Sequence, residues 1–363
     1  MPGPQATNES GMTLGKELAP LVEAVQTNCH IADARGAADL TLCIYLLQMR
    51  ELYRWEQGID ALQPLPREAV ARWLAEREAL WEALESRDYG PLPLAGARFD
   101  PFDVAAVNAG LRPLGLVYGA GCVAPGRASF VLAQLEHAER RGELELLVAG
   151  IEHARGLSAP PAVLQASTVL LRRESMQRWL WQKFEAWRLK RPDGPFKSAL
   201  DAHGFAGDGE QALQRLAEAE LETLLLHELG EFEVGRELGA EWQALRAALP
   251  SRRAELYVRA ARDHWADCRI TLPRLLQQRN DASLHFWFAN LEGVRALLFP
   301  RLWSAHAAWC AGDRGAALRD AVSRGEVHWR RMCVMLLSLQ RSGDAGTPQA
   351  LEQLAVSPEW TLH

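Results

Sequence analysis

The residues best suited to chemistry lie in the segment 216–238, LAEAELETLLLHELGEFEVGREL, where Glu220, His227 and Glu231 occur at i, i+7 and i+11. At 3.6 residues per turn this spacing places the three side chains in one narrow stripe of a helix, which Leu224 shares. Carboxylates and an imidazole on a leucine-bearing face must reach water or find a partner. Their oxygen and nitrogen donors suit iron or manganese. We therefore predict a metal site formed by these three residues.

Additional ligands are expected from other helices. His30 and Asp33 are three positions apart, and so are His264 and Asp267. Glu51 continues the face of the first pair, but it lies roughly 30 Å further along a straight helix. Either the first pair or Glu51 can therefore meet the acidic helix, but not both. These five residues are secondary candidates for metal ligands.

Three further residues are expected to support the ligands from outside. Glu228 lies about 100° from the stripe and is either such a group or a surface residue. Arg50 and Arg54 flank Glu51 among large apolar side chains. A buried ion-pair network would explain these charges equally well without a metal.

The remaining histidines are expected to be structural. His285, His306 and His328 each stand alone on an apolar helical segment, where hydrogen-bonded core histidines are commoner than ligands. His137 and His153 have charged neighbours and are expected at the surface.

Several classes of function are disfavoured. The net charge is −6 and no basic block occurs, so nucleic-acid binding is not expected. The glycines of GAGCVAPG do not form a dinucleotide fingerprint, and no P-loop occurs, so no nucleotide cofactor is expected. No apolar run reaches 18 residues and the N-terminus lacks a signal-peptide layout, so neither a membrane span nor export is expected. Six scattered cysteines without a CxxC pair indicate a cytoplasmic protein.

The elements that must position these residues are mostly helices. Helical patterns dominate outside 87–157, where prolines and glycines recur and SFVLAQLEHA and GELELLVAG alternate around a charged turn, as in a β-hairpin. The predicted fold is mainly α, an antiparallel multi-helix bundle with a small β-hairpin excursion. Residues 1–14 and 344–363 are expected as a loose N-terminal tail and a polar C-terminal tail around a single helical domain, 15–343. Thirteen tryptophans are expected to pack between helices, and Pro300 should kink or split its helix.

Two resemblances add to this interpretation. The segments NCHIADARGAADLTLCIYLLQMRELYRWE and ELETLLLHELGE resemble an uncharacterised family of bacterial all-helical proteins, which brings no assigned activity. The spacing of Glu220 and His227 resembles part of the pattern in haem-oxygenase-like dinuclear oxidases, helical bundles that activate dioxygen at two irons. Their later helix carries a His, Asp, His cluster, for which this chain offers only His264 and Asp267.

The resulting expectation is a helical metalloprotein that binds iron or manganese. The second resemblance implies an oxidase or oxygenase acting on a small organic substrate. The alternative is a non-catalytic helical adaptor or ligand-binding protein without a metal. A protein partner or a homo-oligomer is compatible with either.

Overall fold

The computed structural model describes residues 17–60, 63–124, 127–205, 209–249, 251–342, 349, 352–353 and 357–363. The chain divides into two compact units, residues 1–183 (unit 1) and residues 184–363 (unit 2), where the sequence analysis expects a single domain over 15–343. Each unit has its own hydrophobic core. The expected N-terminal tail, 1–14, lies outside the described residues.

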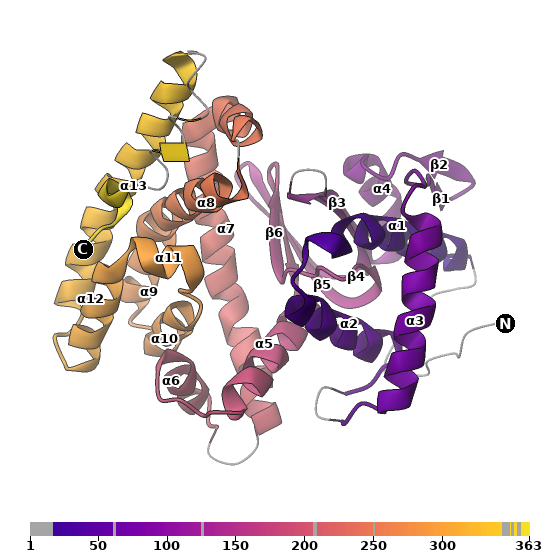
Figure 1. Cartoon of the computed structure of the whole chain (residues 1–363), viewed down its shortest axis with the longest axis horizontal. Coiled ribbons are helices and arrows are strands. Elements are labelled where there is room, and N and C mark those ends of the chain that lie inside the picture. The colour runs from indigo at the N-terminus through magenta and orange to yellow at the C-terminus, as the bar shows by residue number, and fades with distance from the viewer. Residues whose placement is uncertain are drawn as a thin grey trace. The chain divides into compact units, whose positions relative to one another are not determined.

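Unit 1 combines helices with a five-stranded sheet (Figure 1). Its elements are α1 (Ala19–Gly36), η1 (Ala37–Asp39), α2 (Leu42–Glu56), α3 (Arg67–Leu84), β1 (Leu92–Leu94), β2 (Ala97–Phe99), α4 (Val104–Leu111), η2 (Arg112–Leu114), β3 (Leu116–Ala124), β4 (Arg127–Arg141), β5 (Leu144–Arg155), β6 (Ala162–Gln165) and β7 (Thr168–Arg172). Helix α5 (Arg173–Arg188) continues from β7 across the boundary between the units.

The predicted hairpin is confirmed, but it is part of a larger sheet. Strands β4 and β5 pair antiparallel from Arg141↔Leu144 around a two-residue turn, in which Gly142 takes the positive φ that glycine tolerates. The strand order is β3-β4-β5-β7-β6, and the β5–β7 pair is parallel while the others are antiparallel. Strands β1 and β2 form a separate two-stranded sheet.

The predicted antiparallel helical bundle with a small hairpin is therefore wrong, because unit 1 is built on a curled mixed sheet. Strand β4 reads RASFVLAQLEHAERR, in which Ala, Leu, Gln and Glu are good helix formers. Packing against neighbouring strands overrides that propensity. The parallel β5–β7 contact joins segments about twenty residues apart, and local periodicity carries no signal for such a pairing.

Helix α1 covers one part of this sheet and supplies the core of unit 1. Leu21, Val25 and Cys29 are buried against strand residues that include Phe130 and Leu132. The Cys29 thiol donates a hydrogen bond to the Phe130 carbonyl oxygen over 3.3 Å. The apolar face of α1 therefore fixes the polar residues that share this helix, His30 and Asp33, at the edge of the core.

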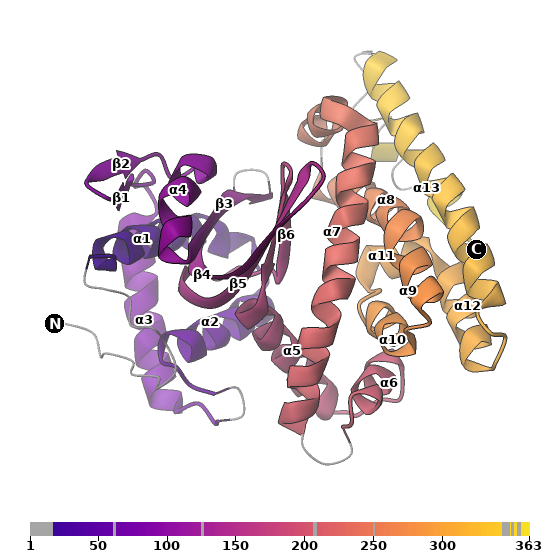
Figure 2. The ribbon, with the colours of Figure 1, turned by 180° about the vertical axis from the view of Figure 1, so that it is seen from behind.

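Unit 2 is helical in its described residues. Figures 1 and 2 show its long helices α7 and α13 on either side of the shorter helices α8, α9 and α11. Its elements are the end of α5, then α6 (Pro195–Ala202), α7 (Gly209–Ala248), α8 (Arg252–Ala266), a π-helical turn η3 (Asp267–Thr271), α9 (Leu272–Gln278), α10 (Asp281–Ala289), α11 (Gly293–Leu298), α12 (Pro300–Cys310), α13 (Ala316–Ser342) and η4 (Pro358–Trp360).

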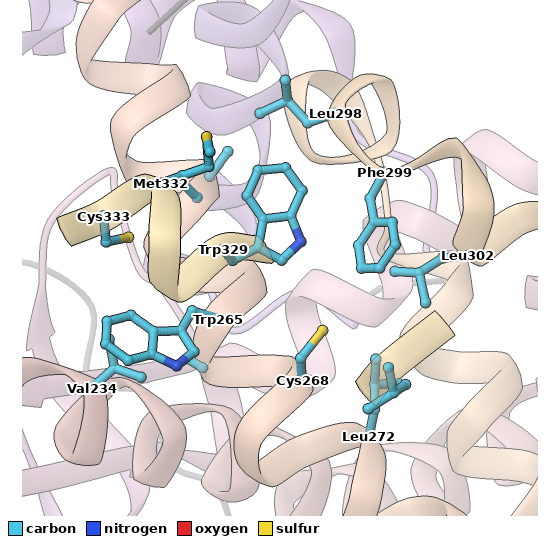
Figure 3. Packing of buried hydrophobic residues seen from close by; sticks show 14 of the residues in the cluster. Val234, Trp265, Cys268, Leu272, Leu298, Phe299, Leu302, Trp329, Met332 and Cys333 are labelled. Atoms are coloured by element: carbon cyan, nitrogen blue, oxygen red, sulfur yellow. The ribbon is translucent and has the colours of Figure 1, made fainter. Parts of the chain in front are cut away.

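Tryptophans contribute to the core of unit 2, as predicted. Trp265 and Trp329 are fully buried among leucines, cysteines and Phe299, and Figure 3 shows these side chains packed together. Trp360 is also fully buried, so the C-terminal residues expected as a polar tail include a core side chain. Pro300 splits its helix into α11 and α12, as expected from its missing N–H. Within the described part of the chain, no helix combines the length and apolarity that crossing a bilayer requires.

Candidate functional site

The acidic stripe of α7 faces the interior of unit 2. Leu221, Leu225 and Leu226 are buried on this part of the helix, and their packing carries the stripe inward with them. The Glu220 side chain is 0% exposed, that of Glu231 13% and that of His227 24%. The chain thus removes two carboxylates and an imidazole wholly or largely from water, and each needs a partner there.

The hydrogen-bond partners of Glu220 are different from those of His227 and Glu231. Its carboxylate accepts hydrogen bonds from the hydroxyl of Thr223 over 2.6 Å and from that of Ser283 over 2.9 Å. His203 Nε2 lies 3.8 Å from the same carboxylate. Glu220 lies two turns, roughly 10 Å, before His227 on the helix. The structure therefore gives Glu220 its own hydroxyl pocket and does not join it to His227 and Glu231.

His227 lies between two carboxylates. Its Nδ1 is 2.8 Å from Asp267 Oδ1, and its Nε2 is 3.4 Å from Glu231 Oε1. Burial disfavours the charged imidazolium, but Asp267 and then Glu231 outweigh this effect and raise the pKa of His227. The predicted pair His227 and Glu231 is thus joined by Asp267, which the sequence analysis named as a secondary candidate.

Helix α8 contributes Arg262 and Asp263 to the same group of side chains. The donor atoms of His227, Glu231 and Asp263 all lie within 4.8 Å of one another. Arg262 Nη2 contacts Glu231 Oε1 at 2.5 Å and Asp263 Oδ1 at 3.1 Å. Burial raises the pKa of Glu231, but Arg262 and His227 prevail and lower it; for Asp263, burial and Glu231 raise the pKa.

Asp267 is held on its other side by Arg295, whose guanidinium forms an ion pair with Oδ2. Burial opposes the charge of Asp267, but His227 and Arg295 lower the pKa of its carboxyl. His264 does not point to this cluster, because its Nε2 donates to the Arg295 carbonyl oxygen over 2.9 Å and its ring stacks on Trp329. Burial, with Arg295, lowers the pKa of His264 to about 3.

Two backbone features bring α7 and α8 close together at this point. A Cβ at Gly230 would lie 2.6 Å from the carbonyl oxygen of Ala266, so the glycine permits backbone contact between the helices. The residue after Ala266 begins the π-helical turn, a feature that is frequent at functional sites. Two i, i+4 pairs therefore face each other: His227 with Glu231 on α7, and Asp263 of α8 with Asp267 at the start of η3.

Glu228 is the acid of the cluster whose neutral form the fold favours. It is buried next to His227, and burial followed by the charge of Glu231 raises its pKa to about 7. Its carboxyl can therefore hold or release a proton near neutral pH. We name the group formed by His227, Glu228, Glu231, Arg262, Asp263, Asp267 and Arg295 the α7–α8 cluster.

The predicted ligands in unit 1 have partners of their own. Arg77 Nη1 lies 2.7 Å from His30 Nε2, and burial with that charge lowers the pKa of His30 to about 3. Asp33 accepts the backbone N–H of Leu157 over 2.9 Å.

The charges around Glu51 also stay within unit 1. Arg54 Nε lies 3.4 Å from Glu51 Oε1, both side chains being buried, which matches the ion-pair alternative. Arg54 also donates to the carbonyl oxygens of Asp60 and Gln63. Arg50 is half-buried.

Sequence reasoning missed Asp263 and both arginines. Asp263 stands four residues before Asp267, the spacing of a single helical face, and that pattern is the signal that could have found it. Arg262 and Arg295 carried no such signal. Arginines occur throughout the sequence, and nothing in the spacing of these two sets them apart. Their place in the cluster depends on how α8 and α11 pack.

Comparisons with known proteins give a family without an activity. Residues 20–172 match the N-terminal domain, and residues 177–358 the C-terminal domain, of a family of unknown function (DUF6866). The junction of the two matches lies close to the division of the chain at 183 and 184. No curated protein and no solved structure matches the chain.

Proposed function

The chain belongs to this family of unknown function, DUF6866, and we propose that it binds a divalent metal ion, manganese or iron, in unit 2 through His227, Glu231 and Asp263. The single observation that carries the proposal is the convergence of these three donor atoms within 4.8 Å from two helices. Family membership contributes no activity, so the chemistry of the residues is the whole basis.

The donor set fits a hard or borderline ion. Two carboxylates and one imidazole are ligands that iron and manganese accept. Metal-ligating histidines commonly donate their second ring N–H to a carboxylate, which fixes the ring and the tautomer. Asp267, 2.8 Å from His227 Nδ1, stands in that role and leaves Nε2 directed towards Glu231. An ion bound at Nε2 would take the place of the proton there, which would be released to solvent.

Arg262 is the competitor of such an ion. Its guanidinium contacts both Glu231 and Asp263, and so it neutralises the carboxylates that a cation would use. Binding of a divalent ion requires this guanidinium to leave the two oxygens. The proposal therefore predicts that Arg262→Gln strengthens metal binding, whereas a purely structural ion-pair network predicts only a loss of stability.

The chemistry we propose for the loaded site is oxidation of a small organic substrate with dioxygen as the electron acceptor, for which bound manganese or iron would supply one-electron redox and Lewis-acid chemistry. The contribution of the chain is positional. His227, which is 24% exposed, gives access from solvent, and the adjacent Glu228 carboxyl can deliver or accept a proton near pH 7.

The test is metal binding by the full chain prepared without an affinity tag. The chain is stripped with a chelator and titrated anaerobically with Mn²⁺ and Fe²⁺ by calorimetry. We expect one ion per chain, with binding lost in Glu231→Gln and His227→Gln and strengthened in Arg262→Gln. The matched control is Glu222→Gln, which makes the same charge change at an exposed position of the same helix. Wild-type affinity in Glu231→Gln and His227→Gln, or no binding by any form, would refute the proposal.

A second candidate function, a non-catalytic binding protein, is favoured by helix α2. Leu42 is 70% exposed and Leu47 54%, and Ile44 and Leu46 are also exposed on this helix. Four exposed apolar side chains within residues 42–47 of one helix make it a candidate association surface. We propose that the chain self-associates through α2. The double variant Leu42→Lys, Leu47→Lys should shift the mass measured by light scattering towards the monomer, and an unchanged mass would exclude it.

A further inference from the structure

Unit 2 contains a second group of metal-ligating side chains, away from the α7–α8 cluster. His285 belongs to α10, whereas His306 and Cys310 belong to α12. The sequence analysis treats the two histidines as isolated core residues. The structure instead brings one donor atom from each of the three residues within 4.8 Å of the others.

Two separate helices create this convergence. Pro300 begins α12, and from there His306 and Cys310 follow at i and i+4 on one face of the helix. Helix α10 begins after Asn280, whose side chain accepts a hydrogen bond from the backbone N–H of Ser283. His285 then lies one turn into α10 and meets the face of α12.

The distances match those of a tetrahedral metal site. His306 Nε2 lies 3.3 Å from His285 Nδ1 and 3.8 Å from Cys310 Sγ. Zinc bonds of about 2.05 Å to nitrogen and about 2.3 Å to sulfur, at tetrahedral angles, place two nitrogens about 3.3 Å apart and nitrogen and sulfur about 3.6 Å apart. Small side-chain adjustments therefore suffice to bring all three atoms to one ion.

The surroundings also suit a cation. His306 is buried and His285 is half-buried, so protein side chains cover much of the two imidazole rings. Aromatic rings enclose the group: the Phe288 ring lies 4.2 Å from that of His306, and the Trp309 ring 4.7 Å from that of His285. The carboxylate of Asp281, one turn before His285 on α10, favours a positive charge near the His285 ring.

We propose that His285, His306 and Cys310 bind a zinc-class metal ion through two imidazole nitrogens and one thiolate. This donor set is softer than that of the α7–α8 cluster and therefore selects zinc over manganese. On binding, the Cys310 thiol releases its proton to solvent and the sulfur donates to the metal. Cys310 is exposed, so a fourth position is open to water or to a small ligand.

The test uses the full chain, stripped with a chelator and kept reduced with a phosphine. Zinc affinity is measured by competition with a chromophoric chelator, and Co²⁺ serves as the spectroscopic probe. We expect a cobalt–thiolate charge-transfer band in the near ultraviolet and tetrahedral d–d bands in the visible region. Cys310→Ser should abolish the thiolate band, and Cys310→Ser and His306→Gln should each weaken zinc binding at least about 100-fold.

Controls separate this site from the rest of the chain. Cys43→Ser removes another exposed thiol, and His328→Gln removes another helical histidine of unit 2. Both should keep the wild-type zinc affinity and the cobalt–thiolate band, which reports on Cys310 and not on the carboxylates of the α7–α8 cluster. Absence of the thiolate band in the wild type, or wild-type zinc affinity in Cys310→Ser and His306→Gln, would overturn the proposal. Circular dichroism of each variant shows whether it is folded.

Discussion

Two buried charge clusters, one in each unit, differ in how completely their charges are paired. In unit 1, the Glu152 carboxylate accepts two hydrogen bonds from Arg172, at 2.9 and 2.8 Å, and one from the Ser175 hydroxyl at 2.6 Å. Arg155 lies 3.6 Å from the same group, and the Glu152 side chain is 0% exposed. One carboxylate thus meets two guanidinium groups and a hydroxyl, which leaves no acid unpaired.

The α7–α8 cluster has a different balance. Its four carboxylates share one imidazole and three guanidinium groups, one of which is the exposed Arg259, whose Nε lies 3.8 Å from Asp263 Oδ2. Burial, followed by the charge of Glu231, raises the pKa of Glu228 to about 7. His227 is also partly open to solvent. A carboxylate that is fully paired with guanidinium groups holds a fold in place, whereas a cluster that contains a neutral carboxyl and reaches water can accept a cation. The comparison therefore favours a structural role for Glu152 and supports the proposal that the α7–α8 cluster binds a metal ion.

The largest effect is expected at Glu152. Glu152→Gln leaves Arg172 and Arg155 buried without a counter-charge, and losing one partner of a buried pair costs about 3–5 kcal/mol. Urea unfolding should measure the loss of stability. Native-state hydrogen exchange should show that the amide protons with weakened protection lie in unit 1. Glu139→Gln, at an exposed ion pair with Arg141, should change the stability little, because solvent screens such a pair. Equal losses in the two variants would mean that Glu152 is not structural.

The geometry of the α7–α8 cluster is tested at Gly230. A Cβ there would meet the Ala266 carbonyl oxygen, so Gly230→Ala should force the helices apart and cost about 2–3 kcal/mol. Gly235→Ala, five residues later on α7, meets nothing within 4 Å and should stabilise the chain by about 0.5–1 kcal/mol. Thermal unfolding of both variants measures the difference. If Gly230→Ala is as stable as Gly235→Ala, the close approach does not position the cluster.

Acid should weaken both units through one buried histidine in each. The pKa values of His30 and His264 are lowered from 6.5 to about 3, so the unfolded chain binds their protons first. Their stabilising contribution is complete above pH 6.5 and is lost as the pH falls towards 3, by about 2 kcal/mol per histidine at pH 5. Urea unfolding between pH 7.5 and 5 should show this slope. His30→Asn and His264→Asn should each flatten it, and an unchanged slope in both would contradict the assignment.

The smallest expected effect on stability is that of substituting Glu228. The pKa of Glu228 is raised, so its neutral form favours folding below pH 4.5 and this contribution is lost as the pH rises through 7. Glu228→Gln keeps the neutral form at every pH and should stabilise the chain by about 1–2 kcal/mol at pH 8, with little change at pH 4.5. Urea midpoints at the two pH values measure it. A destabilised variant at pH 8 would show that the fold does not favour the neutral form of Glu228.

The sequence by itself determined features that depend on neighbouring residues along the chain. The spacing of His227 and Glu231 among leucines predicted a helix with its polar stripe turned inward, and both side chains are largely buried. Alternation around a charged turn predicted the hairpin of β4 and β5, and the missing N–H of Pro300 predicted the break between α11 and α12. Local propensity and periodicity govern each of these features.

Only the tertiary structure decided which residues meet. It paired β5 with β7 in parallel, separated Glu220 from His227, and placed Asp263 and Arg262 against Glu231. It also brought His285 to His306, although each stands alone on its own helix. Periodicity fixes the face of a helix on which a side chain lies, but the partner of that face depends on packing between elements that are distant in sequence.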